Sequence, residues 1–421
     1  MSEPLAAAAA GFDFAPAVVE AAQAAFAECE PVWRRRDELA LSVTAKVVGA
    51  FVRAGIDESH LWGSTGYGYH DAGRDRFESL IAQLMGAPRA LARLQLVSGT
   101  HAIVATLSAL LRDGGTLCSL TGRPYDTLRL ALADHPDSMA KLGVRYFETV
   151  WPAGAPLSDA EVLAALAHDP DVVFIQRSRG YAPRPSLSVA QIGKLIDAVR
   201  ERSPESLVVV DNCYGEFVEL DEPGDVGADA VIGSLIKNPG GGLAVTGAYI
   251  AGTNDVVARV AERIFAPGLS AHIGPTLDTL RWNFAGLHRA PKCVGESLKI
   301  MDFAAALFKR LGFDVDPGCG DARTDTIQAI RLGSPERLAT FAAGLQRLLP
   351  VNSKAKPEPG RVPGYDAMVL MASGAFVSGS TMELSCDAPL RPPYEVYVQG
   401  GLDLAHGVLA MMSAASAVGG A

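Results

Sequence analysis

The stretch that decides the fold is DAVIGSLIKNPGGG, residues 229–242. Its apolar start, residues 229–232, reads as a buried strand, and Lys237 follows it in a glycine-rich loop. Burial lowers the pKa of a lysine and frees its amine for Schiff-base chemistry, which is the use a buried lysine most often serves in an enzyme. A lysine that reaches into solvent fits this stretch alone equally well, so the neighbouring motifs must decide between the two.

The composition indicates a large globular protein. The chain has 421 residues, of which 49% are hydrophobic and 20% charged, enough to bury one big domain and a smaller one. Its net charge of -10 argues against nucleic acid or an anionic membrane surface as the main partner. The basic run Arg34-Arg35-Arg36 reads as the solvated face of a helix.

Cysteine usage and hydropathy favour a cytoplasmic protein. The six cysteines are scattered singly, and neither they nor the eight histidines have the spacing of a metal site. No charged and then apolar leader opens the chain, and no stretch approaches the roughly 18 apolar residues of a membrane span. We therefore expect a soluble protein without a metal.

The first part of the chain predicts a helical arm followed by a binding loop. Residues 14–54 read as two helices, the second with one apolar face that ends at Gly55. Residues 62–74 combine glycines with aromatic and cationic side chains, which is typical of a binding loop. We place the N-terminal arm at residues 1–60.

Residues 75–265 alternate between short apolar strands and amphipathic helices. This pattern predicts an α/β domain with a mostly parallel sheet covered on both faces, whose ligands bind at the carboxyl ends of the strands. The expected strands are 92–97, 116–120, 144–150, 171–176, 206–211, 228–233 and 245–251, and the expected helices are 75–86, 100–112, 125–133, 158–168 and 188–202.

The remaining residues predict a smaller α+β domain. Two helical patterns occupy residues 272–312, and the pattern changes beyond Pro317. The expected strands are 325–332, 367–372, 381–386 and 394–399, and the expected helices are 334–348 and 402–418. We place the large domain at residues 61–290 and the carboxyl-terminal domain at residues 291–421.

Polar side chains follow the predicted strands at four places. Ser98-Gly99-Thr100-His101 opens a helix whose free amides suit a phosphate, although the same residues make an ordinary helix start. Tyr125 follows the next strand and can stack on a planar ring. Asp211 ends an apolar strand, where it can pair with a cation, bind a metal or cap a helix. Lys237 comes about 26 residues later.

The order of these groups predicts a pyridoxal phosphate site. It supplies in turn a phosphate loop, a ring-stacking tyrosine, an aspartate for the protonated pyridine nitrogen and a Schiff-base lysine. Ser234 can add a hydroxyl to the phosphate. Arg177 and Arg179 follow another strand, and we expect one of them to face the cofactor's phenolic oxygen or the substrate.

Seven motifs carry a resemblance to a known family. They are VSGTHA, TGRPYDTL, IQRSRGY, VDNCYGEFVE, SLIKNPGGG, RTDTIQAIRLGSPE and YVQGGL, spread over about residues 60–415. Through them the chain resembles the methionine gamma-lyase-like family, once called aluminium resistance proteins. That family lies within the fold-type-I pyridoxal phosphate enzymes, so the resemblance implies their large domain with a seven-stranded sheet and their smaller α+β domain.

The resemblance implies a role for each residue of the predicted site. Lys237 forms the imine with the cofactor, Asp211 lies against the pyridine nitrogen and Tyr125 covers the ring. The amides of residues 99–101 bind the phosphate.

The resemblance also implies a homotetramer assembled from dimers. A neighbouring chain then completes each active site, and Tyr67, Tyr69 and Arg74 are the residues expected to reach across to the phosphate.

The chain departs from the family pattern near the expected substrate pocket. His70, Val245 and Ala248 stand where the wider family usually has an acidic residue, a proline and a glycine. Tyr397 stands where better-known gamma-lyases hold the substrate carboxylate with an arginine. Arg391 or Arg331 could replace that arginine, and either is equally well explained as a surface residue.

The reaction that the resemblance implies is elimination from an amino acid. The Lys237 amine takes the alpha proton, a beta proton follows, and the group on the gamma carbon then leaves with Tyr125 as acid. A thiolate from methionine or cystathionine is the default leaving group, and a halide or an activated oxygen fits the same chemistry.

Three other functions remain open. An aminotransferase and a gamma-synthase need the same lysine and aspartate, and the old family name suggests a non-catalytic stress protein. Ammonia and a 2-oxo acid formed without an acceptor would distinguish a lyase from both enzymes. Absorbance near about 420 nm that disappears in Lys237→Ala would eliminate the non-catalytic protein. A Rossmann dehydrogenase fits poorly, because no GxGxxG follows a first strand with an acidic residue about 20 positions later.

Overall fold

The computed structural model of the protein describes residues 10–151, 157–362 and 365–419. The chain divides into two compact units, one formed by Val43–Ala290 and the other by Met1–Ser42 together with Pro291–Ala421. The predicted large domain also ends at residue 290, and the predicted domain boundaries stay predictions. The predicted arm of residues 1–60 is divided between the two units.

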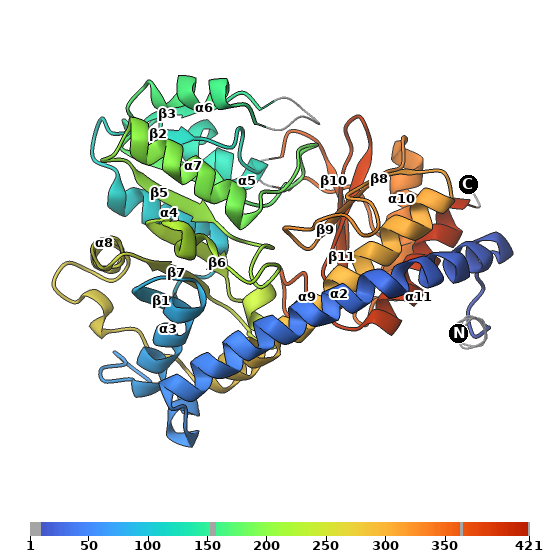
Figure 1. The fold of residues 1–421 in the computed structure, drawn as a ribbon, viewed down its shortest axis with the longest axis horizontal. Coiled ribbons are helices and arrows are strands. Elements are labelled where there is room, and N and C mark those ends of the chain that lie inside the picture. The colour runs from blue at the N-terminus through green and yellow to red at the C-terminus, as the bar shows by residue number, and fades with distance from the viewer. Residues whose placement is uncertain (1–9, 152–156, 363–364, 420–421) are drawn as a thin grey trace. The chain divides into compact units, whose positions relative to one another are not determined.

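The larger unit is built on a seven-stranded sheet with the strand order β1-β7-β6-β5-β4-β2-β3 (Figure 1). The pairings from β6 through β5, β4 and β2 to β3 are parallel, whereas β7 pairs with both β6 and β1 in antiparallel fashion. The prediction of a mostly parallel sheet is therefore confirmed. The strands are β1 (Arg89–Arg93), β2 (Thr116–Ser119), β3 (Arg145–Glu148), β4 (Val172–Gln176), β5 (Leu207–Asp211), β6 (Ala230–Ser234) and β7 (Ala248–Gly252).

Several helices of this unit begin after a residue whose side chain accepts a free backbone N–H of the first turn. Four of them start after a serine or threonine whose hydroxyl accepts an N–H of the first turn, namely Ser98, Ser158, Ser188 and Thr253. The helices are η1 (Glu58–Leu61), α3 (Ala72–Leu84), α4 (Gly99–Leu110), α5 (Asp126–Arg129), η2 (Leu130–Asp134), α6 (Asp159–Leu166), α7 (Val189–Arg202), η3 (Pro223–Val226), η4 (Asn238–Gly240), α8 (Asn254–Ile264) and η5 (Ser270–His272).

The parallel strands are buried on both faces. Val208, Val209 and Val210 are consecutive in β5, so their side chains alternate between the faces, yet none is exposed to solvent. Helices α4, α5 and α8 pack against one face, where their apolar side chains join Phe174 and Ile232 in one core. This burial explains why the strands read as continuous apolar runs.

The first strand differs from its prediction. The sequence predicts it at residues 92–97, but β1 pairs with β7 from Arg89 to Arg93 and ends opposite Ala248. Since β7 begins at Ala248, the residues after Arg93 have no partner strand. They turn instead, with the Leu96 N–H donating to the Arg93 carbonyl at 3.3 Å.

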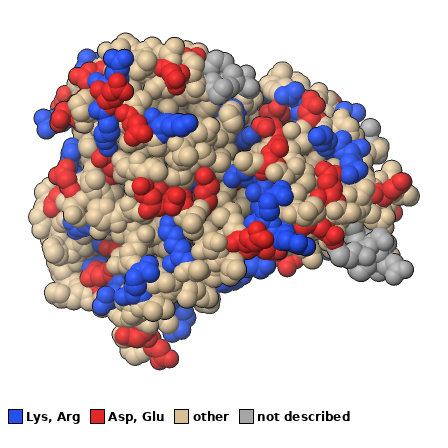
Figure 2. Space-filling view, in the orientation of Figure 1, with Lys and Arg blue, Asp and Glu red and all other residues tan. Residues whose placement is uncertain are grey.

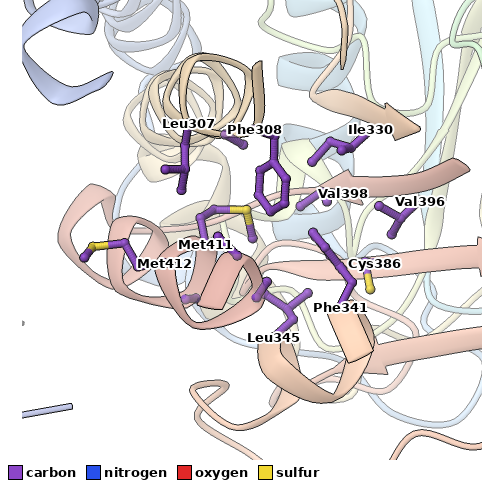
Figure 3. Packing of buried hydrophobic residues seen from close by; sticks show 14 of the residues in the cluster. Leu307, Phe308, Ile330, Phe341, Leu345, Cys386, Val396, Val398, Met411 and Met412 are labelled. Atoms are coloured by element: carbon purple, nitrogen blue, oxygen red, sulfur yellow. The ribbon is translucent and has the colours of Figure 1, made fainter. Parts of the chain in front are cut away.

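The smaller unit contains an antiparallel sheet in the order β10-β11-β12-β9-β8. One face packs on helices, and Figure 3 shows Phe308, Phe341 and Met411 meeting over Ile330 and Val398. The elements are β8 (Asp314–Asp316), which the sequence does not predict, β9 (Ile327–Arg331), α10 (Pro335–Gln346), β10 (Val369–Ser373), β11 (Ser385–Pro389), β12 (Glu395–Gln399) and α11 (Leu404–Gly419).

The prediction of paired helices is wrong in two places. Residues 14–54 contain one helix, α2 (Pro16–Ala54, 39 residues), and residues 272–312 contain one long helix, α9 (Leu280–Arg310, 31 residues). Each includes a proline, Pro31 or Pro291. An interior proline removes one backbone hydrogen bond. Each helix has buried side chains before and after its proline, and their packing keeps the helix continuous through it.

The surface carries both signs of charge. On the face shown in Figure 2, basic side chains are interspersed with acidic ones. Among the described residues, no helix has the length and apolar character needed to cross a bilayer.

Candidate active site

Lys237 lies in the turn that follows β6. Its N–H donates to the Ser234 carbonyl at 3.2 Å, and η4 begins at the next residue. The glycines beyond it are required by close packing, since a side chain at Gly240 would collide with the Leu235 carbonyl oxygen. The loop therefore fixes the backbone of Lys237 at the carboxyl end of the sheet.

The ammonium of Lys237 is surrounded by acidic and aromatic groups. Its Nζ lies 3.9 Å from the centroid of the Tyr214 ring, a cation–π distance. Burial by itself lowers the pKa of Lys237, but Cys213, Tyr214 and Asp211 together raise that pKa well above its ordinary value. The half-buried Lys237 is thus held protonated by its own pocket in the cofactor-free protein.

Asp211 ends β5, the strand next to β6. The residue is 4% exposed, and its Oδ1 accepts the Cys213 N–H at 3.1 Å. Burial raises the pKa of Asp211, while the charge of Lys237 opposes the rise. A cation placed beside this carboxyl would stabilise its ionised form and offset the cost of burying the charge.

The predicted phosphate loop opens helix α4. The Ser98 hydroxyl accepts the His101 N–H at 3.1 Å, so Ser98 is the N-cap of the helix. A side chain on Gly99 would lie 3.2 Å from Cys213 Sγ and 3.7 Å from Ser234 Cβ. The start of α4 therefore lies directly against the turn after Asp211 and the end of β6.

Tyr125 belongs to the same edge of the sheet. Its hydroxyl lies 2.7 Å from Thr100 Oγ1, and its N–H donates to Gln176 Oε1 at 3.0 Å. Burial raises the pKa of Tyr125 well above its ordinary value, and the charge of Asp211 adds to the rise. The phenol is therefore protonated at neutral pH.

The geometry of Arg177 argues against the substrate role that the sequence predicts for it. The side chain is fully buried and donates to Asn212 Oδ1 at 2.7 Å, Glu219 Oε2 at 2.6 Å and Glu222 Oε2 at 3.3 Å. These partners leave it as a structural ion pair beneath the site. Arg179 is also buried, at 3% exposure, and its role stays a prediction.

Arg74 is held by carbonyls of its own chain. It is 3% exposed, and its Nη1 donates to the Gly68 carbonyl at 2.7 Å and to the Gly274 carbonyl at 3.1 Å. These bonds fix the loop to its own chain, and the contact of Arg74 with a neighbouring chain's phosphate stays a prediction. Tyr67 and Tyr69 are 69% and 52% exposed, and their side chains remain accessible.

The predicted substrate residues of the carboxyl-terminal half lie in the smaller unit. Arg331 pairs with Glu395 at 3.1 Å and with Asp314 at 3.3 Å, and the Tyr397 hydroxyl donates to Glu395 at 2.9 Å. Arg391 follows β11 in a turn. Binding of a substrate carboxylate by Arg391 stays a prediction.

The prediction omits Tyr214 and Arg184. Tyr214 has a φ of 70°, unusual for a residue with a side chain, and this backbone places its ring against Lys237. Arg184 donates to the carbonyls of Gln176 and Ser178 and helps to lower the pKa of Asp211 against the effect of burial. An aromatic residue three positions after the strand-end aspartate is the sequence signal for Tyr214.

A mostly parallel sheet with a lysine, a buried aspartate and a capped helix start at its strand ends is the arrangement of the fold-type-I class, and the chain shares the fold of a pyridoxal phosphate-dependent protein of Escherichia coli with a TM-score of 0.59 at 18% identity. The chain belongs to the methionine gamma-lyase family, whose sequence model matches residues 18–419. The protein is accordingly a lyase.

Relatives of the chain agree with this assignment. It is 40% identical to the uncharacterised protein YnbB of Bacillus subtilis over 373 residues, covering 88% of this chain and 89% of YnbB. A carbon-sulfur lyase involved in aluminium resistance from Clostridium novyi is 35% identical with a TM-score of 0.91, covering 97% of each chain. A proposed cystathionine beta-lyase involved in aluminium resistance from Clostridium acetobutylicum is 39% identical with a TM-score of 0.92, again covering 97% of each.

Proposed function

We propose that the protein is a pyridoxal phosphate-dependent carbon-sulfur lyase that expels a thiolate from the gamma carbon of an amino acid. The observation that carries the proposal is the pair of adjacent strands β5 and β6, which bring Asp211 and the Lys237 turn to one sheet edge. The description of the Clostridium novyi relative as a carbon-sulfur lyase supports the bond that is broken.

The residues at this edge fit the cofactor. The first turn of α4 and the Ser234 hydroxyl would hold the phosphate. Because Gly99 has no side chain, the start of α4 can lie close to Cys213 and Ser234. Asp211 would pair with the pyridine nitrogen, and Tyr125 would cover the ring. When bound, pyridoxal phosphate supplies an aldehyde that condenses with amines and a ring that draws electrons from the alpha carbon.

The chain's own residues move the protons. The Lys237 amine would take the alpha proton, and the Tyr214 ring would stabilise the ammonium that results. A beta proton must also leave before the bond between the gamma carbon and sulfur breaks. Asp211 would keep its negative charge beside the protonated pyridine nitrogen. The protonated phenol of Tyr125 donates a proton to the departing sulfur.

The products from cystathionine test the proposal, because this substrate has a beta and a gamma carbon on either side of one sulfur. We expect ammonia, cysteine and 2-oxobutanoate without any added acceptor, measured by amino-acid chromatography and a 2-oxo acid assay. Homocysteine and pyruvate would instead mean beta-elimination. Amino transfer to an added 2-oxo acid, without free ammonia, would mean an aminotransferase. The same incubation with the Lys237→Ala protein controls for reactions of free pyridoxal phosphate.

We further propose that two chains share each active site, as the family resemblance implies. Segments 62–69, 95–97 and 274–277 support this, since they touch one another and carry exposed apolar side chains. The Gly274 N–H donates to the Tyr67 carbonyl at 2.8 Å, and Gln95 Nε2 donates to the Pro275 carbonyl at 2.8 Å. The exposed side chains are Trp62, Tyr67, Tyr69, Val97 and Leu277. An apolar patch of this kind marks an interaction surface.

Mixing two inactive variants tests whether the site is shared. Neither the Lys237→Ala protein nor a Tyr67→Ala, Tyr69→Ala protein should show substantial activity alone. After subunit exchange, we expect equimolar mixtures to regain about a quarter of the wild-type activity, because half of the dimers then contain one intact site. Recovery is measured as ammonia release, with unmixed variants treated identically as controls. Mixtures that stay inactive although mass spectrometry detects the mixed dimer would contradict the shared site.

A further inference from the structure

Glu216 is a buried carboxyl that the proposed mechanism does not use. It lies five residues after Asp211 and has no exposed surface. The residue touches the Lys237 loop on both sides. Its carbonyl oxygen accepts Asn238 Nδ2 at 3.0 Å, and its Oε1 lies so close to Gly233 that any side chain there would collide with it.

The hydrogen bonds of Glu216 leave one of its oxygens without a donor. Oε1 accepts the Tyr249 hydroxyl at 3.2 Å, and Tyr249 in turn receives Asn212 Nδ2 at 3.4 Å. Oε2 has no hydrogen-bond partner among the described residues, and neither does Asn238 Oδ1. Two buried acceptors without donors are costly, and a proton on Oε2 turns one of them into a donor.

The charges around Glu216 also favour its protonated form. Burial raises the pKa of Glu216 to about 8, Glu222 and Asp211 add to the rise, and Lys237 opposes it. A neutral Glu216 leaves Asp211 as the counter-charge of Lys237, whereas an ionised Glu216 adds a second negative charge. The titratable groups that face Glu216 are Asp211 and Cys213 from β5 and its turn, Glu222 from the same segment, Lys237 from the loop after β6 and Tyr249 from β7.

We propose that Glu216 is a positioning residue that holds a proton beneath the lysine loop at neutral pH and releases it in mildly alkaline solution, changing the charge around Lys237. Its backbone positions Asn238, the residue next to Lys237, and its carboxyl sets how strongly the pocket holds a proton on that lysine. The proton on Glu216 is a property of the chain alone, and only its effect on the bound cofactor rests on the proposed function.

Infrared spectroscopy of the full chain without cofactor tests the proton directly. We expect the carbonyl stretch of a protonated carboxylic acid to disappear with a midpoint near pH 8, and this band to be missing from Glu216→Gln. Asp221→Asn, an exposed acid of the same segment, should keep the band and serves as the matched control. A wild-type spectrum without a protonated carboxyl at pH 6.5, or one unaltered in Glu216→Gln, would overturn the proposal.

Tyr249→Phe provides a second test of the infrared titration if the Glu216→Gln protein does not fold. Tyr249→Phe removes the hydroxyl that donates to Oε1, and this hydrogen bond favours the ionised carboxyl. The infrared midpoint should therefore move to higher pH. An unchanged midpoint would show that the titrating group is not Glu216.

The pH titration of bound pyridoxal phosphate tests the effect on Lys237. A negative charge near a protonated nitrogen raises its pKa, so removing the charge lets that proton leave at lower pH. We expect the band near about 420 nm to be lost at a lower pH in Glu216→Gln than in the wild type, by roughly several tenths of a unit. Equal midpoints, together with a positive infrared result, would refute the positioning role. A wild-type protein that never forms the band would refute the proposed function and leave the infrared result standing.

Discussion

The Lys237→Ala protein is expected to form no absorbance band near about 420 nm with pyridoxal phosphate and to eliminate thiolate at least about 10³-fold more slowly than the wild type. The reason is that Lys237 would supply both the covalent link to the cofactor and the base that takes the alpha proton. The measurements are an absorbance spectrum after dialysis and the initial rate of ammonia release.

An exposed lysine provides the matched control for this prediction. Lys194 lies on α7 and is exposed, so Lys194→Ala should keep both the absorbance band and the rate. If Lys237→Ala retained the band, the covalent role would belong to another amine. Loss of the band in both variants would point to an unstable protein, which circular dichroism at the assay temperature would detect.

Much of the architecture could be predicted because burial imposes a readable pattern. Strands such as β5, which has valines in succession, are apolar on both faces only when both faces are covered. The sequence does not show where the pairing of a strand ends, so the predicted strand at residues 92–97 begins several residues after the start of β1. It also does not show that α2 and α9 continue through a proline, since that depends on side chains packed on both sides.

The sequence predicts the role of a site residue where its charge and its position at the end of a strand are enough to define that role. Asp211, Tyr125 and Lys237 each follow a strand, and parallel strands bring their carboxyl ends to one edge. The position of an arginine in the sequence does not show which group its side chain pairs with. Arg74 and Arg177 look like anion ligands in the sequence, but backbone carbonyls hold the first and carboxylates the second. Only the fold shows which cations are already paired.

The same limit applies to the buried acids. Nothing in the sequence distinguishes Glu216 from Glu219, although the first is fully buried and the second forms a partly exposed ion pair with Arg177. Their different surroundings arise from the turn after β5, where Tyr214 and Phe217 adopt positive φ angles of 70° and 63°. After this turn, Glu216 lies against Gly233 and Asn238, whereas Glu219 pairs with Arg177.

Asp211→Asn is expected to lower activity while leaving the cofactor-free protein at least as stable as the wild type. Burial raises the pKa of Asp211 above its ordinary value of about 3.9, so the ionised carboxyl destabilises the folded chain at any pH above that value. Asparagine has the same shape, and its carbonyl can still accept the Cys213 N–H. The unfolding temperature at pH 7 should therefore stay equal or rise, and any gain should shrink as the pH falls and the wild-type carboxyl becomes protonated.

The loss of activity in Asp211→Asn has a separate cause, because an amide cannot hold a proton on the pyridine nitrogen. We expect the elimination rate to fall at least about 10²-fold, since a misplaced or missing proton in catalysis costs about that much. Asp197→Asn, at an exposed acid on α7, should change neither the rate nor the unfolding temperature. A fall in stability that parallels the fall in rate would mean that Asp211 only supports the fold. If the variant keeps its stability and loses its activity, the buried carboxylate of Asp211 destabilises the fold and is needed for the reaction, where the bound cation offsets its cost.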